Sequence, residues 1–448
     1  MLYIPFAILF LFIFVFKFLL PTPVSAYGHH LALFSTGFVL ILVRPKIGKS
    51  LHFVVHSFLK NVQSVFPAML ILALVGILIA FWAKSGVLFH LILLGESLIS
   101  PKFLLPGFAI VNGIASIASG SSWTTAGTVG LAMMGLGSLY GIPPEISAGA
   151  IISGCYFGDK LSPLSDTTIL ASSLTSVPIQ EHIRFMLRTT VPSFVLSLFL
   201  FWIANGYLSP AISIEATKWS ISSHSLDTPI SYLHLIPVLL VFLGSILSLP
   251  SFVSLSLGIL ASLCFLEFPL DQIGSLGHTL LFGYQANTGN ERMDIFLSGG
   301  GLIAVLPTEI LILTAVWFGG SLEGLGYLKS IIQSWKQWIH KKEELLLTAM
   351  SSSFILNLST ADQYLSIVIP ARSFSQFAVE YKVKPKEIAR ALEDSGTLSS
   401  PLVPWNSCGA FMAGSLHVAT ISYLPFVWFN LIHISITVIR LLVQRKIK

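Results

Sequence analysis

Charged residues are scarce in this chain. Lysine, arginine, aspartate and glutamate make up 10% of its 448 residues, whereas soluble domains carry about 25%. Hydrophobic residues make up 54%. This composition excludes an ordinary soluble domain and predicts a polytopic membrane protein. The apolar runs along the chain predict an all-α bundle of about ten to twelve transmembrane helices. The net charge of +5 comes from basic residues in short connections, which is typical of membrane topology, so we expect a lipid bilayer and no nucleic acid as a partner.

Cysteine is equally scarce, and the common catalytic motifs are missing from the sequence. The three cysteines, Cys155, Cys264 and Cys408, form no CxxC pair, so nothing indicates a disulfide framework or a transition-metal site. The chain has no Walker A motif, no GxGxxG and no HExxH. The sequence therefore predicts no cofactor and no enzymatic activity.

The first apolar run, residues 3–20, allows two interpretations. Small residues follow it at Ser25 and Ala26, as after a signal peptide. However, no basic residue precedes the run, Lys17 interrupts it, and it is long enough to span a bilayer, so we expect a retained helix. Basic residues after the second apolar run and at the end of the chain predict that both termini are cytoplasmic.

Three further segments carry expectations about connections. Residues 209–231 are polar and are predicted to form a loop. Residues 288–294 are predicted to be a charged interruption, and residues 297–318 a span that contains three consecutive glycines. The charged run 382–393 is predicted to be a solvated amphipathic helix. The histidines His182 and His224 are predicted to lie in loops.

One stretch, residues 153–168 with the sequence SGCYFGDKLSPLSDTT, is unusually polar for such an apolar chain. Ionisable groups at membrane depth are costly and mark ion or substrate paths. Gly154, Gly158 and Pro163 predict that the helix breaks here, and broken backbone in a membrane is tolerated only where it lies inside protein or lines a cavity. We therefore expect a binding site in this stretch.

An internal repeat organises the sequence. Ser-Pro-Leu at 162–164 recurs at 400–402, an offset of 400 − 162 = 238, while residues 143–146 match 385–388 at an offset of 242. The difference predicts a four-residue insertion in the first copy. We therefore expect two helical halves, 1–208 and 232–448, whose repeated cores cover about 112–176 and 350–414, with broken helices at the centre, as in repeat-built transporters.

The candidate site combines carboxylates with neutral oxygens, which are hard ligands suited to a small cation. Asp159 and Asp166 are the first candidates and Asp362 the next. An ion pair with Lys160, or exposure in a loop, is the alternative for the first two. The candidates for neutral oxygen ligands are Thr124, Thr125, Ser162, Thr167, Thr168 and Asn406.

Three further residues are secondary candidates. Lys160 would neutralise an aspartate in the empty carrier. Asp394 follows the charged run, and Glu309 is a lone carboxylate in an apolar segment that is either functional or paired with a basic group.

Four segments resemble the NhaC family of Na⁺/H⁺ antiporters: GSSWTTAGTVG at 120–130, YFGDKLSPLSDTT at 156–168, ADQYLSIVIP at 361–370 and RALEDSGTLSSPLVPWNSCGAFMAG at 390–414. The resemblance implies a secondary transporter of the bacterial inner membrane that exchanges Na⁺ or Li⁺ for H⁺. Two positions depart from the family pattern: Ile169 stands where Asn is usual after SDTT, and Ser298 begins SGGG where SRGG is usual.

The resulting hypothesis is competition for buried carboxylates. Desolvation favours the neutral form of a buried carboxyl group, so one group can hold either a proton or Na⁺, the only metal ion expected, and alternating access exchanges them. One alternative is an organic-anion exchanger of the malate/lactate type, in which Lys160 and helix N-termini hold a carboxylate. An amino-acid antiporter and a passive cation channel are the others. A homodimer is compatible with each of them.

Overall fold

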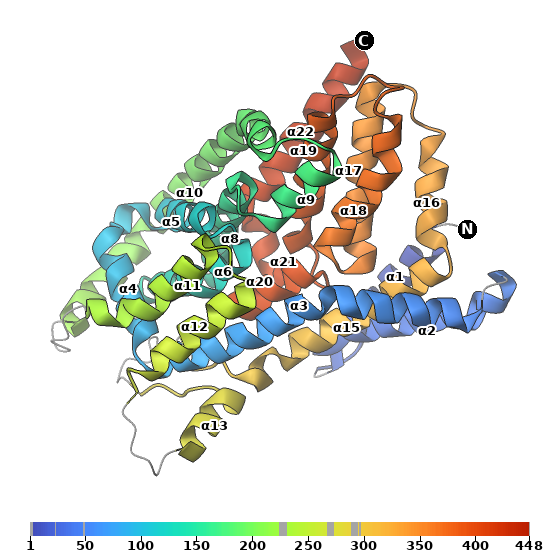
Figure 1. Cartoon of the computed structure of the whole chain (residues 1–448). Helices are drawn as coiled ribbons and strands as arrows, with labels where there is room; N and C mark the ends of the chain where they lie inside the picture. Colours follow the sequence, from blue (N-terminus) through green and yellow to red (C-terminus); the bar gives the residue numbers. More distant parts are fainter. Residues whose placement is uncertain are drawn as a thin grey trace.

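The computed structural model describes residues 3–22, 24–47, 50–223, 231–266, 273–287, 294 and 297–447. Helices build this described part of the chain, and the one β interaction in it is an isolated bridge between Tyr284 and Gly299. Figure 1 shows the helices gathered in one bundle, with long helices crossing beneath a group of shorter ones. The all-α class predicted from composition is confirmed.

The described residues up to 263 form twelve named helices. They are α1 (Ile4–Phe14), α2 (Gly28–Ile47), α3 (Leu51–Lys84), α4 (Val87–Leu98), α5 (Leu104–Ser119), α6 (Ser122–Thr125), α7 (Leu131–Leu139), α8 (Pro144–Leu161), α9 (Asp166–Leu174), α10 (Ile179–Ser223), α11 (Ile236–Ile246) and α12 (Ser251–Leu263).

The described residues that follow form the remaining helices. They are α13 (Ile273–Phe282), α15 (Leu302–Gly324), α16 (Tyr327–Lys336), α17 (Lys342–Thr360), α18 (Gln363–Phe374), α19 (Pro385–Ser399), α20 (Ser407–Leu416), α21 (Thr420–Tyr423) and α22 (Trp428–Ile447).

Four stretches are long and apolar enough to cross a membrane by themselves: Leu51–Lys84, Pro101–Ser119, Ile179–Leu208 and Leu302–Gly324. A fifth arises if Thr420–Phe426 and Trp428–Arg445, which meet at 63°, form one bent span. The expected ten to twelve spans exceed this number for the described residues, because the other apolar helical stretches, such as Gly28–Val43, have only 10–17 residues each. Helix breaks, and not long continuous helices, therefore shape the centre of the bundle.

Several expected boundaries differ from those observed. The predicted loop 209–231 is wrong in its first part, since α10 continues to Ser223. The span expected at 297–318 begins at Leu302, because the three glycines before it have positive φ angles between 73° and 124°, which a helix cannot accommodate. Of the expected charged interruption 288–294, all but Asp294 lies outside the described residues, as does His224.

Two glycines expected to break α8 instead pack it tightly. The helix runs through Gly154 and Gly158 to Leu161. A Cβ atom on Gly154 would lie 2.2 Å from the carbonyl oxygen of Ala109, and one on Gly158 would lie 2.3 Å from that of Gly113. Because both contacts are with the backbone of α5, the glycines allow the two helices to approach closely. The break comes later, at residues 162–165, where Pro163 stands.

Helix starts recur at one offset along the chain. Ser121 caps α6 and Asp362 caps α18, an offset of 362 − 121 = 241. Ser165 caps α9 and Asn406 caps α20, again 406 − 165 = 241. In the same way α8 begins at Pro144 and α19 at Pro385, 241 residues later.

The four-residue insertion expected in the first copy has a different form. The helix α8 has 18 residues and α19 has 15, so the first is three residues longer. Four residues, 162–165, then connect α8 to α9, whereas seven, 400–406, connect α19 to α20. The shorter connection thus compensates for the longer helix. The repeated helix starts are 241 residues apart, and the sequence offsets of 238 and 242 come from local matches that lie close to this spacing.

Both chain ends contact α16 or α17 close to the connection between these two helices. The indole nitrogen of Trp335 donates to the Tyr3 hydroxyl at 2.7 Å. Near the C-terminus, Arg445 Nε lies 2.9 Å from Glu344 Oε1, in the first turn of α17. The two ends of the described chain therefore lie near the basic segment 336–344.

The close packing of α8 on α5 predicts the effect of a single methyl group. We expect Gly154→Ala to lower the free energy of unfolding by about 1–3 kcal/mol, because the added Cβ forces backbone atoms apart. Gly206→Ala is the matched control, since a Cβ atom at Gly206 meets nothing within 4 Å. Thermal unfolding of the two purified variants in detergent measures the difference, and equal unfolding temperatures would contradict the packing argument.

Candidate ion-binding cavity

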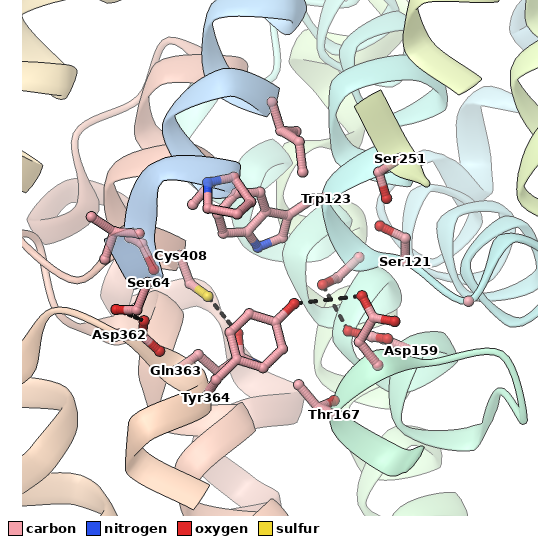
Figure 2. Close-up of a pocket in the computed structure, with 18 residues that line it drawn as sticks. Ser64, Ser121, Trp123, Asp159, Thr167, Ser251, Asp362, Gln363, Tyr364 and Cys408 are labelled. Carbon is pink, nitrogen blue, oxygen red and sulfur yellow. Dashed lines mark hydrogen bonds between the residues drawn. The ribbon is translucent and has the colours of Figure 1, made fainter. Parts of the chain in front are cut away.

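A cavity of about 270 Å³ lies where the broken helices meet. Figure 2 shows its lining, which comes from α3, from the starts of α6, α9, α12, α18 and α20, and from the last turns of α8. The N-terminal end of a helix carries partial positive charge on its free N–H groups, so the five helix starts partly offset negative charge here. These helix starts therefore lie beside the three carboxylates of the cavity, of which Asp159 and Asp362 are buried and Asp166 is exposed.

Asp159 and Asp166 line one side of the cavity. The Ser122 hydroxyl donates to Asp159 Oδ2 at 2.8 Å, and the Asp159 side chain is almost fully buried. Asp166 begins α9, and the Tyr364 hydroxyl lies 3.5 Å from its Oδ2. Thr167 lines the cavity beside it. Two carboxylates and several hydroxyl oxygens therefore face one space.

Asp362 lines the other side. Its Oδ1 accepts the backbone N–H of Leu365 at 3.0 Å, which caps α18, and its Oδ2 accepts the Ser64 hydroxyl of α3 at 2.9 Å. Figure 2 shows the ring of Tyr364 between this pair and Asp159. The local backbone explains the position, since Ala361 has a φ of +58° and ends α17 abruptly. The cavity thus has two carboxylate-bearing sides separated by one aromatic ring.

Four of the residues predicted from the sequence line the cavity: Asp159, Asp166, Thr167 and Asp362. The lining residues that sequence reasoning missed include Ser64, Trp123, Gln363, Tyr364 and Cys408. Gln363 and Tyr364 follow Asp362 directly, and Trp123 lies in the predicted hydroxyl-rich segment. Nearness in sequence to a predicted site residue could therefore have identified these three. Ser64 had no signal, because it lies inside a continuous helix 298 residues from its partner.

The other predicted neutral oxygens lie near the cavity but outside its lining. The Ser162 hydroxyl donates to the carbonyl of Ile117 at 2.8 Å, and Thr125 Oγ1 lies 3.1 Å from Ser119 Oγ. Thr124 Oγ1 is buried and has no hydrogen-bond partner among the described residues. None of these three side chains is among the residues that line the cavity.

Asn406 and Thr168 have partners of their own. Asn406 caps α20 through the backbone N–H of Cys408 at 3.0 Å, and its amide nitrogen lies 3.1 Å from Asn357 Oδ1. The Thr168 hydroxyl donates to Glu393 Oε1 at 2.9 Å. Glu309 stands apart in the middle of α15, half-buried, and neither carboxylate oxygen has a hydrogen-bond partner within the described residues.

Lys160 points away from the cavity, although it follows Asp159 directly. Its Nζ atom lies 2.6 Å from Asp394 Oδ1, and both side chains are completely buried. His433 Nε2 lies 2.9 Å from the same oxygen, and Arg390 Nε lies 3.7 Å from Oδ2. In this structure Lys160 therefore neutralises Asp394 and not an aspartate of the cavity.

Glu393 extends this group of charges. Its Oε2 lies 2.6 Å from His182 Nε2, and both side chains are fully buried. We call Lys160, His182, Arg390, Glu393, Asp394 and His433 the buried ionic cluster. The predicted solvated helix at 382–393 is wrong in its second half, and His182 is not a loop residue but lies in the first turn of α10. Both corrections have one cause, since α10, α19 and α22 pack against one another and exclude water from these polar side chains.

These features define a class: a polytopic helical membrane protein with an acidic cavity at helix breaks, as in ion-coupled secondary transporters. Residues 154–444 match the Na⁺/H⁺ antiporter family. The chain belongs to this family.

Three relatives are similar to this chain over most of its length. The Na⁺/H⁺ antiporter NhaC of Alkalihalophilus pseudofirmus is 38% identical, over 80% of this chain and 78% of the relative. The malate-2H⁺/Na⁺-lactate antiporter of Bacillus subtilis is 34% identical, over 91% and 88%. The arginine/ornithine antiporter ArcD of Halobacterium salinarum is 33% identical, over 83% and 78%.

The buried ionic cluster predicts a stability effect. Asp394→Asn would leave the buried Lys160 ammonium without its counter-charge, so we expect the free energy of unfolding to fall by about 3–5 kcal/mol. Glu181→Gln is the control, because Glu181 forms an exposed ion pair with Lys386 and its loss should leave the unfolding temperature nearly unchanged. A thermal shift of the same size in both variants would contradict the prediction.

Proposed function

We propose that this chain is a secondary transporter that exchanges Na⁺ or Li⁺ for H⁺ across a bacterial inner membrane by alternating access. The observation that carries the proposal is the charge of the cavity. Three aspartates line it, and no lysine, arginine or histidine stands among its described lining residues. Negative charge inside a membrane protein is costly unless a cation or a proton compensates it, so the cavity is suited to cations.

The same carboxylates serve both ions in this proposal. Carboxylate and hydroxyl oxygens are the ligands that small hard cations prefer, and Asp159, Asp166, Ser122 and Thr167 supply them on one side of the cavity. When Na⁺ leaves, protons replace it on the carboxylates, because a buried ionised carboxyl group without a counter-charge is unfavourable. Occupancy by either ion neutralises the site, and competition between them couples their movements.

Two observations favour cations over organic anions. Lys160, which would hold a substrate carboxylate, is engaged by Asp394 at 2.6 Å. The acidic lining would also repel an anion. An organic cation is the second candidate, since the aromatic rings of Trp123 and Tyr364 also line the cavity and cations bind favourably over such rings. The relative named an arginine/ornithine antiporter is compatible with that candidate.

Alternating access in this proposal uses two repeat-related halves, 1–208 and 232–448. The constant offset of 241 between the capped starts of α6 and α18, of α8 and α19, and of α9 and α20 supports this division. Each half contributes aspartates to the cavity, Asp159 and Asp166 from the first and Asp362 from the second. Relative movement of the halves would therefore change the surroundings of the ions.

We also propose that both termini lie in the cytoplasm. The contacts of Tyr3 with Trp335 and of Arg445 with Glu344 support a common side for the two ends. The connection on that side, 336–344, contains Lys336, Lys341 and Lys342, and basic connections remain in the cytoplasm.

Proton movement in everted vesicles tests the function. In vesicles with an acid interior, prepared from cells lacking their own antiporters, NaCl or LiCl should dissipate the pH gradient, and sodium malate should act no faster than NaCl. Asp159→Asn should abolish this response at normal abundance, because the site loses a group that holds either ion. Glu181→Gln should respond like the wild type, since its side chain is exposed and lies outside the cavity.

Three outcomes would contradict the proposal. A response only with malate present would indicate organic-anion exchange. Sodium flux without compensating proton movement would indicate a passive channel. Full activity of Asp159→Asn would remove the assigned site.

A further inference from the structure

The helices α11 and α12 form a hairpin that is too short to cross a membrane. Its two apolar stretches, Tyr232–Ile246 and Ser251–Leu263, each have 10–17 residues, whereas a spanning helix needs about 20. Residues 247–250 join them, and Figure 1 shows the two helices side by side. The ends of the hairpin meet, since the ring centroids of His234 and Phe265 are 4.5 Å apart. The hairpin therefore enters and leaves the bundle on one side, as a re-entrant segment does.

The base of the hairpin lies at the end of α3. The ring of His234 stacks on that of His90 with centroids 4.2 Å apart, and a Cβ atom on Gly86, just after α3, would lie 3.7 Å from the His234 ring. The start of α3 lies beside the end of α15, because a Cβ atom on Gly324 would lie 2.6 Å from Val54 Cα. From there α15 leads through α16 to the basic connection that we place in the cytoplasm. The hairpin therefore enters from the opposite, outer side.

The tip of the hairpin, residues 246–251, reaches the cavity. Ser251 is the first residue of α12 and lines the cavity, and in Figure 2 it stands at the same edge of the lining as Ser121 of α6. Residues 246–250 are exposed. Within the described part of the chain, no hydrogen bond joins any residue of the tip to another helix. The tip therefore borders the cavity without being fastened to its other walls.

The body of the hairpin is closely packed and is anchored near its base. A Cβ atom on Gly244 would lie 2.6 Å from Ser254 Oγ, and one on Gly258 would meet the side chain of Val241, so the two helices touch along their length. The indole nitrogen of Trp82, close to the end of α3, donates to the carbonyl of Gly258 at 3.2 Å. The hairpin is thus a rigid unit with a fixed base and a free tip.

We propose that the α11–α12 hairpin is the outer gate of the cavity. The hairpin turns about its base at the end of α3, and its tip covers or uncovers the route between the cavity and the outer surface. The other helix starts at the cavity lie within or beside the repeated cores 112–176 and 350–414, whereas the hairpin lies outside both, so its movement leaves the aspartates in place. Alternating access requires a barrier on each side that opens in turn, so the inference rests on the proposed function.

Cysteine labelling from one side of the membrane tests the gate. The exposed native Cys264 is first replaced by serine, and Ser251→Cys then places a thiol at the tip. In intact cells, a membrane-impermeant methanethiosulfonate should modify this thiol at rates that differ at least about threefold between NaCl and choline chloride, because Na⁺ shifts the population of open gates. In everted vesicles prepared from the labelled cells, the response to NaCl should be lost, and dithiothreitol, which removes the adduct, should restore it.

Leu260→Cys is the matched control. Leu260 lies on the same helix, is exposed, and is not among the residues that line the cavity, so its labelling rate should be the same in both salts. Equal rates in both salts for Ser251→Cys, or no labelling of intact cells, would make the hairpin a fixed wall and overturn the gate. Labelling from the cytoplasmic side alone, in everted vesicles, would overturn it as well. Loss of the NaCl response in the unlabelled Cys264→Ser parent would contradict the proposed function instead, and the labelling rates would still decide between a moving and a fixed hairpin.

Discussion

The cost of leaving a carboxylate without a counter-charge inside an apolar bundle governs this structure. The buried carboxylates meet that cost in two ways. Asp394 lies among Lys160, Arg390 and His433, so its charge is compensated permanently. The cavity aspartates, such as Asp159, have hydroxyl and backbone partners but no cation among the described residues around them. In the proposed function, ions that enter the cavity supply this compensation.

Helix breaks make this arrangement possible. A continuous helix would bond its own N–H groups and leave none for a carboxylate, whereas a helix start directs free N–H groups into the interior. Asp362 uses such a start as a cap and keeps one oxygen for Ser64. The close packing of α8 on α5 through Gly154 holds two of the breaks in register. The chemistry of the site therefore depends directly on where the helices begin and end.

Part of this site was predictable from the sequence, and part of it depends on packing. Asp159, Asp166 and Asp362 stand out because carboxylates are rare in apolar surroundings and occur here next to glycine, proline and hydroxyl residues. The direction of Lys160 was not predictable, since neighbours on a helix point about 100° apart and only the position of α19 decides which faces the cavity. His182 was missed for a similar reason, because its polar sequence neighbours are exposed while its own ring is covered by α19.

Proton release on sodium binding tests the central claim most directly, that Na⁺ and H⁺ compete for the cavity carboxylates. Purified protein in weakly buffered detergent solution, near neutral pH, would be mixed with NaCl while the pH is recorded, with choline chloride as the ionic-strength control. The account predicts that NaCl releases protons, that the release saturates, and that Asp159→Asn reduces it. Saturable binding of ²²Na⁺ without any release of protons would contradict the account.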